Sequence, residues 1–96
     1  MNLENLIAIK SIASHYELEI IFFENLNDLG IIEIITVNEE YYLEHDMIIK
    51  VEKVIRIHKD LDINTEGIAV VLNLLEKIDM LEQELNAAKN SLRLYH

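Results

Sequence analysis

The sequence predicts a small, mainly α-helical domain with one short β-hairpin and a long helix at its C-terminal end. The chain has 96 residues, which is the size of a single domain. Along most of it, apolar residues recur every three or four positions, as they do on one face of a helix. Residues 31–43 are instead rich in β-branched and aromatic side chains, which favour strands.

The first thirty residues have the layout of a helix-turn-helix. Residues 5–9 are apolar and could form a first strand. Helical spacing begins at Ile9 and gives way to a turn at 15–17, and a second short helix is expected over about 19–29. Gly30 then stands where a helix commonly ends in a left-handed residue. Two short helices joined by about three or four residues are typical of a helix-turn-helix.

The middle of the chain predicts a two-stranded hairpin followed by a third helix. Residues 31–37 form one strand, 38–40 a turn and 41–43 the returning strand, which together resemble the wing of a winged-helix unit. We expect Asp46 to cap the third helix, which continues to about Lys59.

The last helix is expected to be the longest, with Asn64 as its cap and Glu66 in its first turn. The spacing between the apolar residues of this helix alternates between three and four, but two three-residue steps meet at Ile78. This shift in the position of the apolar face indicates that the helix changes its packing partner there. The first half would face the domain's own core, and the second half would face another molecule, most simply a second copy. Its apolar residues are Ile68, Val71, Leu75, Ile78, Leu81, Leu85, Ala88, Leu92 and Tyr95. The candidate dimer-interface residues are Ile78, Leu81, Leu85, Ala88 and Leu92.

The charge of the chain is unevenly placed. The net charge is −10, and residues 1–44 alone hold nine acids against one base, a balance of −8. Residues 45–64 hold four acids and four bases and are neutral overall. A partner of the first half should therefore be basic or apolar.

The composition argues against catalysis and metal binding. The chain has no cysteine, and no two of its four histidines have a metal-binding spacing. There is no glycine-rich phosphate loop and no candidate nucleophile beside a base. We therefore expect no enzyme activity, no cofactor and no metal. Neither a signal peptide nor a membrane-spanning run is visible, so we expect a cytoplasmic protein.

DNA binding is disfavoured even though the layout is that of a helix-turn-helix. Readers of DNA present Arg, Lys, Asn or Gln from the second helix and cations to phosphates. Here residues 19–28 contain no base, and the predicted wing tip carries Glu39 and Glu40. One basic stripe occurs on the third helix, and a solvated face is its simpler interpretation. This stripe consists of Lys50, Lys53 and Arg56.

The second helix opens with four apolar residues, 20–23, which cannot all point inward. Either one of them is incidentally exposed, or it is an apolar anchor ringed by acids. The second interpretation suits a basic helical partner, because acids steer encounter and an aromatic ring supplies contact area. The candidate partner-binding residues are Glu17, Glu19, Ile20, Phe22, Glu24 and Asp28.

The order of these elements resembles the MerR-like winged helix-turn-helix fold. Residues 56–72, RIHKDLDINTEGIAVVL, followed by Leu75-Glu76-Lys77-Ile78 and Leu81, look like the chaperone-modulatory CbpM family. Leu29-Gly30-Ile31-Ile32-Glu33 is also similar to that family's turn into the wing. The chain departs from the family in lacking the proline that usually follows the wing entry.

This resemblance implies a homodimer that binds the J-domain of a DnaJ-like, CbpA-type co-chaperone and blocks its engagement with Hsp70. The alternative is a MerR-like DNA-binding transcriptional regulator. The expected organisation is one domain over 1–96. Within it, 1–44 form the helix-turn-helix and wing, 45–63 the third helix, and 64–96 the long dimerisation helix.

Overall fold

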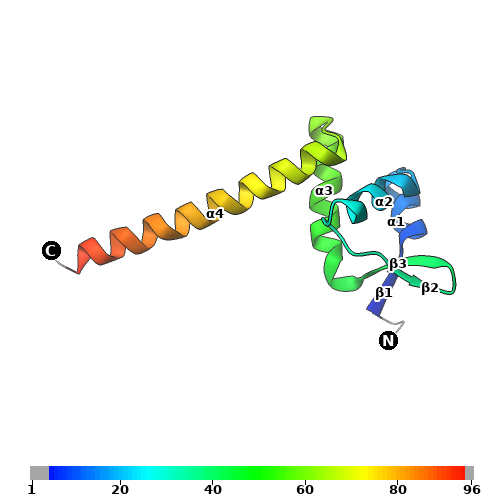
Figure 1. The fold of residues 1–96 in the computed structure, drawn as a ribbon, viewed down its shortest axis with the longest axis horizontal. Coiled ribbons are helices and arrows are strands. Elements are labelled where there is room, and N and C mark those ends of the chain that lie inside the picture. The colour runs from blue at the N-terminus through cyan, green and yellow to red at the C-terminus, as the bar shows by residue number, and fades with distance from the viewer. Residues whose placement is uncertain (1–4, 95–96) are drawn as a thin grey trace.

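The computed structural model describes residues 5–94 of the chain. A small domain holds all elements except the distal part of the last helix, which projects far from it (Figure 1). The predicted mainly α fold, with a winged helix-turn-helix and a long terminal helix, is confirmed. The elements are β1 (Leu6–Ala8), α1 (Ile9–Tyr16), α2 (Ile20–Asp28), β2 (Ile35–Val37), β3 (Glu40–Glu44), the 3₁₀ turn η2 (His45–Met47), α3 (Ile48–Leu61) and α4 (Thr65–Arg93).

Helices α1 and α2 meet across a three-residue turn, as the sequence predicts. Glu17 ends α1 in the left-handed conformation with φ of 56°. The backbone N–H of Leu18 then donates to the carbonyl of Ala13 at 2.8 Å. On α3, the Lys59 ammonium donates to the carbonyl of Tyr16, so the third helix also holds this turn.

Gly30 ends α2 in the way its position predicts. Its φ is +75°, a conformation that glycine adopts without a steric cost. The N–H of Ile31 donates to the carbonyl of Leu26 at 2.9 Å, and that of Gly30 to Asn27 at 3.0 Å. This pair of bonds is a Schellman motif, and it satisfies carbonyls that the helix end would otherwise leave open.

The wing is a hairpin, but it belongs to a three-stranded antiparallel sheet of order β1–β3–β2. The predicted two-stranded sheet is therefore incomplete, because the apolar β1 pairs with the free edge of β3, with Ile7 opposite Leu43. The hairpin turn is Asn38 and Glu39, both with positive φ, as a tight two-residue turn requires.

The first strand of the wing is shorter than predicted. Residues 31–34 are not in a strand, and β2 covers only Ile35–Val37. Ile31 and Ile32 are buried in the core instead, which uses their apolar bulk without any strand pairing. Their β-branched side chains therefore reflect packing rather than a longer sheet.

A single apolar core lies between the three short helices, the sheet and the start of α4. Val51, Val54 and Ile55 bring α3 into it, in agreement with the helical spacing. Asp46 does not cap α3, because it lies inside η2 and Met47 is the N-cap without a side-chain bond. The fully buried side chains are those of Phe23, Ile9, Leu26, Leu43, Ile68, Val51 and Val54.

Helix α4 belongs to the domain only at its beginning. Asn64 caps it as predicted, since its Oδ1 accepts the N–H of Gly67 at 2.8 Å. Ile68 is fully buried, but every residue of 73–94 is exposed. The helix thus leaves the core after Leu72, and the expected boundary at Ile78 is wrong by about two turns. Tyr95, the last residue of the predicted stripe, lies outside the described residues.

Candidate protein-binding surfaces

The projecting part of α4 carries a continuous apolar stripe. Steps of three and four alternate without a break when Leu74 is counted in place of Leu75, so the shift of the apolar face predicted at Ile78 is not needed. We call this set the α4 seam; its described residues are Val71, Leu74, Ile78, Leu81, Leu85, Ala88 and Leu92. They share one face of the helix, which is different from the face that carries the half-buried Leu72.

From Leu74 onward, every residue of the α4 seam is exposed among the described residues 5–94, while Val71 at its start is half-buried. Leu74, Ile78 and Leu81 are 52%, 50% and 63% exposed, and Leu85 and Leu92 are 55% and 61% exposed. Contiguous apolar surface of this kind on a soluble domain marks an interaction site. A heptad spacing sustained over about three repeats is the pattern that pairs with another helix.

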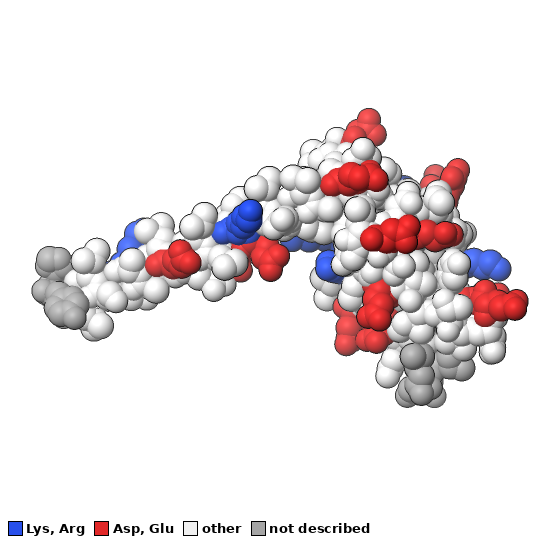
Figure 2. Space-filling view, viewed as in Figure 1, with Lys and Arg blue, Asp and Glu red and all other residues white. Residues whose placement is uncertain are grey.

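The helix-turn-helix carries a second candidate surface, which is acidic. Several acidic side chains lie on the face of the domain visible in Figure 2, with few basic ones among them. On this half of the molecule a groove runs between α2 and the first turn of α4. We call it the acidic groove; it is lined by Glu17, Leu18, Glu19, Ile21, Phe22, Asn25, His58, Asn64, Thr65 and Glu66.

The floor of the acidic groove is rigid and apolar. Phe22 is only 7% exposed and packs edge-on against Phe23, with ring centroids 5.4 Å apart. Its other neighbour is His58 of α3, whose ring lies at 4.7 Å. The prediction that Phe22 is an exposed anchor is therefore wrong, because its ring is needed in the core. Ile21 is the exposed member of the apolar run, at 53%.

The wall formed by α3 and α4 is held by local hydrogen bonds. The Nδ1 atom of His58 lies 2.7 Å from the carbonyl oxygen of Ile63, which fixes the connection between the two helices. Asn64 closes the first turn of α4 through its cap. The hydroxyl of the buried Thr65 donates to the carboxylate of Glu66 at 3.3 Å.

The structure brings together only part of the predicted partner-binding set. Glu17, Glu19 and Phe22 all line the acidic groove. Ile20 is half-buried and faces the wing, where it lies with Ile9 and Tyr41 around a different hollow. Glu24 and Asp28 lie on α2 outside the groove.

Seven of the ten residues that line the acidic groove are not in the predicted partner-binding set, and Ile21, Glu66 and His58 are among them. Ile21 could have been found from the helical phase of α2, since it points away from Phe23 and Leu26. Glu66 and His58 reach the acidic groove from α4 and α3. Only the tertiary packing of these helices on α2 brings them there, and no local pattern signals it.

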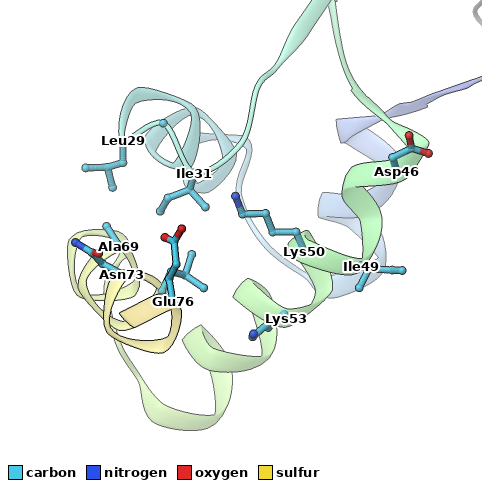
Figure 3. Close-up of a pocket in the computed structure, with 11 residues that line it drawn as sticks. Leu29, Ile31, Asp46, Ile49, Lys50, Lys53, Ala69, Asn73 and Glu76 are labelled. Atoms are coloured by element: carbon cyan, nitrogen blue, oxygen red, sulfur yellow. The ribbon is translucent and has the colours of Figure 1, made fainter. Parts of the chain in front are cut away.

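A third surface is a hollow lined by the end of α2, by α3 and by α4 (Figure 3). In this view the amine of Lys50 points into the hollow, towards the carboxylate of Glu76, while the side chain of Ile49 turns outward. Lys53 also lines the hollow. Ile49 is 82% exposed. The basic stripe is thus divided, because Arg56 does not line this hollow and Lys50 faces an acid of α4.

The described residues also bear on two other classes of function, metal binding and membrane insertion. Within residues 5–94, no group of three or more His, Asp or Glu side chains could hold a metal ion. In the same residues, no helix combines the length and apolar character needed to cross a membrane.

Comparison with known protein families gives a match over most of the chain. The profile of the family described as MerR HTH family regulatory protein matches residues 7–90, which include every helix and strand from α1 to α3 and most of α4. No curated protein and no solved structure matches the chain significantly. Since the matched segment covers most of the chain and its winged helix-turn-helix has the expected layout, the protein belongs to the MerR HTH family of regulatory proteins.

Proposed function

We propose that this chain is a regulator that acts by binding another protein rather than DNA. The observation that carries the proposal is the surface of its helix-turn-helix. Helix α2, which occupies the position of a DNA-reading helix, contains no Lys or Arg and exposes Asp28, and the wing turn exposes Glu39. Binding of duplex DNA gains from counterion release only where cations meet phosphates, and this surface would oppose it.

The specific function we propose is modulation of a DnaJ-like, CbpA-type co-chaperone. The resemblance of residues 56–72 to the CbpM family supports it. Such a modulator would bind the J-domain and block its engagement with Hsp70. A J-domain offers a basic helix to Hsp70, and the acidic groove with its exposed Ile21 has the complementary chemistry. Competition for one surface requires binding only, and proteins of this regulatory family are generally not enzymes.

We also propose that the chain works as a homodimer through α4 (Thr65–Arg93). The α4 seam supports this, because a second copy supplies a seam of the same spacing and burial of several leucines stabilises the pair. Its direction, parallel or antiparallel, is left open by the pattern of apolar residues.

The experiment mixes the protein with each DnaJ-like protein of its own cell and follows J-domain-stimulated ATP hydrolysis by Hsp70. We expect stimulation by one of them to fall in proportion to the amount of the chain added. Unchanged stimulation with every one of them at saturating concentration would overturn the co-chaperone assignment.

The second candidate is a DNA-binding transcriptional regulator, and the family match favours it equally. A fluorescence titration with duplex DNA at low salt, where phosphate attraction is strongest, separates the two. We expect no binding below about 10 µM, the range of non-specific binding. Tight and sequence-selective binding would instead establish the regulator of transcription.

A further inference from the structure

We propose that the acidic groove is the docking site for a basic amphipathic helix of a partner protein, and that α2 and the start of α4 grip it together. The inference rests on the proposed function in that the partner is a protein. It goes further by assigning the contact to one groove. That groove includes Glu66 of α4 and does not include Glu24 and Asp28.

The charge around the groove determines what can bind there. Three of its lining side chains are carboxylates, those of Glu17, Glu19 and Glu66. Within residues 5–94, no Lys or Arg lines the groove. Lys59 lies on the neighbouring α3, and its ammonium is directed to the carbonyl of Tyr16. The groove thus presents negative charge from two separate elements, the turn before α2 and the first turn of α4, and its ligand must be cationic.

The apolar residues of the groove determine the shape of that ligand. Ile21 is half exposed, and it lies beside the half-buried Leu18 and the edge of the buried Phe22. A flexible polar tail would leave this apolar surface in water. A helix with leucines on one face and lysines or arginines on its flanks covers it and also meets the carboxylates.

The groove is formed before any ligand arrives. His58 is anchored to Ile63 and packs on the Phe22 ring, Asn64 caps α4, and Thr65 is buried. The backbone that carries all three carboxylates is thereby fixed relative to the apolar floor. A preformed groove loses less conformational freedom on binding than a flexible one, which favours affinity.

The test uses a synthetic helical peptide of about 18 residues, or five turns, with leucines on one face and lysines and arginines on the other. Fluorescence anisotropy at low salt measures its affinity for the full chain. We expect binding, and we expect no binding of a peptide in which glutamates replace the cations. Added salt should slow association of the basic peptide more than it speeds release, as steering by charge requires.

Matched variants locate the site. The inner pair, Glu19→Gln and Glu66→Gln, removes two charges that line the groove. The outer pair, Glu24→Gln and Asp28→Asn, removes two charges that lie outside it. The inner pair should weaken binding by roughly tenfold in combination, while the outer pair should change it less than about twofold. Ile21→Ser should speed release, and because this side chain is half exposed the variant should still fold. Far-UV circular dichroism and the unfolding midpoint check folding in each case.

The outcomes separate this inference from the proposed function. Equal losses for the inner and outer pairs would overturn the groove and leave a diffuse acidic attraction. A co-chaperone that binds all the inner variants as it binds the unmodified chain would overturn the groove while sustaining the modulator. Peptide binding that depends on the inner residues, without inhibition of any co-chaperone, would sustain the groove and overturn the modulator.

Discussion

The two parts of this molecule treat similar apolar side chains in opposite ways. In residues 5–72, isoleucines, leucines and valines from all four helices, from β1 and β3 and from the segment after α2 converge on one core, and seven large side chains are fully buried. In residues 73–93, leucines recur at regular spacing and all of them are exposed. The molecule is 62 Å along its longest axis and 21 Å along its shortest, so nothing in the domain can fold back to cover that helix (Figure 1).

This difference indicates where the partner of each region lies. The core of the domain is buried within one chain, so the free energy of unfolding of the domain should not depend on protein concentration. The α4 seam can be buried only against another molecule, so the stability of the projecting part of α4 should depend on protein concentration. The following predictions test this contrast, from the largest effect to the smallest.

The largest effect is expected from charges in the α4 seam. Replacing Leu85 and Leu92 by Asp puts two carboxylates per chain into the proposed interface, where they cannot be hydrated or paired. Sedimentation velocity should show a dimer for the unmodified chain at tens of micromolar, a scale at which modest interfaces are populated, and a monomer for the variant. A control with Asp at Asn86 and Asn90, on the other side of the helix, should remain dimeric. An unmodified chain that sediments as a monomer would contradict the dimer.

Truncation in the core should have a different signature. Leu26→Ala removes a fully buried side chain and should lower the free energy of unfolding by about 2–5 kcal/mol, through lost burial and a cavity. Urea unfolding monitored by circular dichroism at several protein concentrations provides the measurement. The loss should be the same at each concentration, whereas the loss caused by Leu81→Ala in the α4 seam should grow as the chain is concentrated into the range where the unmodified protein dimerises. If the losses of unfolding free energy in the two variants depended on protein concentration in the same way, the proposed difference between the core and the α4 seam would be wrong.

Much of the fold could be predicted from local patterns. Helical spacing located α1, α2, α3 and α4, and Gly30 and Asn64 marked helix ends that the structure confirms. These signals succeed because each depends on a few neighbouring residues. The errors arose where a pattern was ambiguous. Leu74 and Leu75 are both apolar, so two helical phases fit the sequence, and only the departure of α4 from the domain distinguishes them.

The candidate site was less accessible to prediction. Ile20, Phe23 and Leu26 recur at helical steps, which puts Phe22 on a different side of α2 from the core. Phe22 is nevertheless buried, because His58 of α3 packs against its ring. The β-branched run at 31–34 has the same propensity whether it pairs in a sheet or packs in a core. Glu66 joins Glu19 in one groove only through the crossing of α4 over α2, which tertiary packing alone decides.

A smaller loss is expected at the end of α2. Gly30→Ala would place a Cβ in open space, since no atom lies within 4 Å of that position. The variant should therefore lose free energy of unfolding only because alanine disfavours the left-handed backbone conformation of Gly30, by about 1–2 kcal/mol. Gly30→Asn should recover part of it, because Asn tolerates this conformation better. Thermal unfolding compares the three chains, and an Ala variant as stable as the unmodified protein would contradict the assigned φ.

The smallest effect is predicted at Asn64, where the two regions join. Its side chain satisfies the N–H of Gly67 at 2.8 Å, so Asn64→Ala leaves a donor at the start of α4 without its partner. The expected loss is about 1 kcal/mol in the unfolding of the domain, and Asn64→Ser should keep most of the stability because Ser is also a strong cap. The cap is four residues from the buried Ile68 and more than two turns from the first fully exposed leucines of the α4 seam. Loosening it should therefore weaken the anchoring of α4 to the core while the dissociation constant of the dimer changes less than about twofold. Amide hydrogen exchange gives the decisive comparison: faster exchange confined to residues 65–70 supports independent regions, and faster exchange along the whole of α4 would show that the cap supports the projecting helix as well.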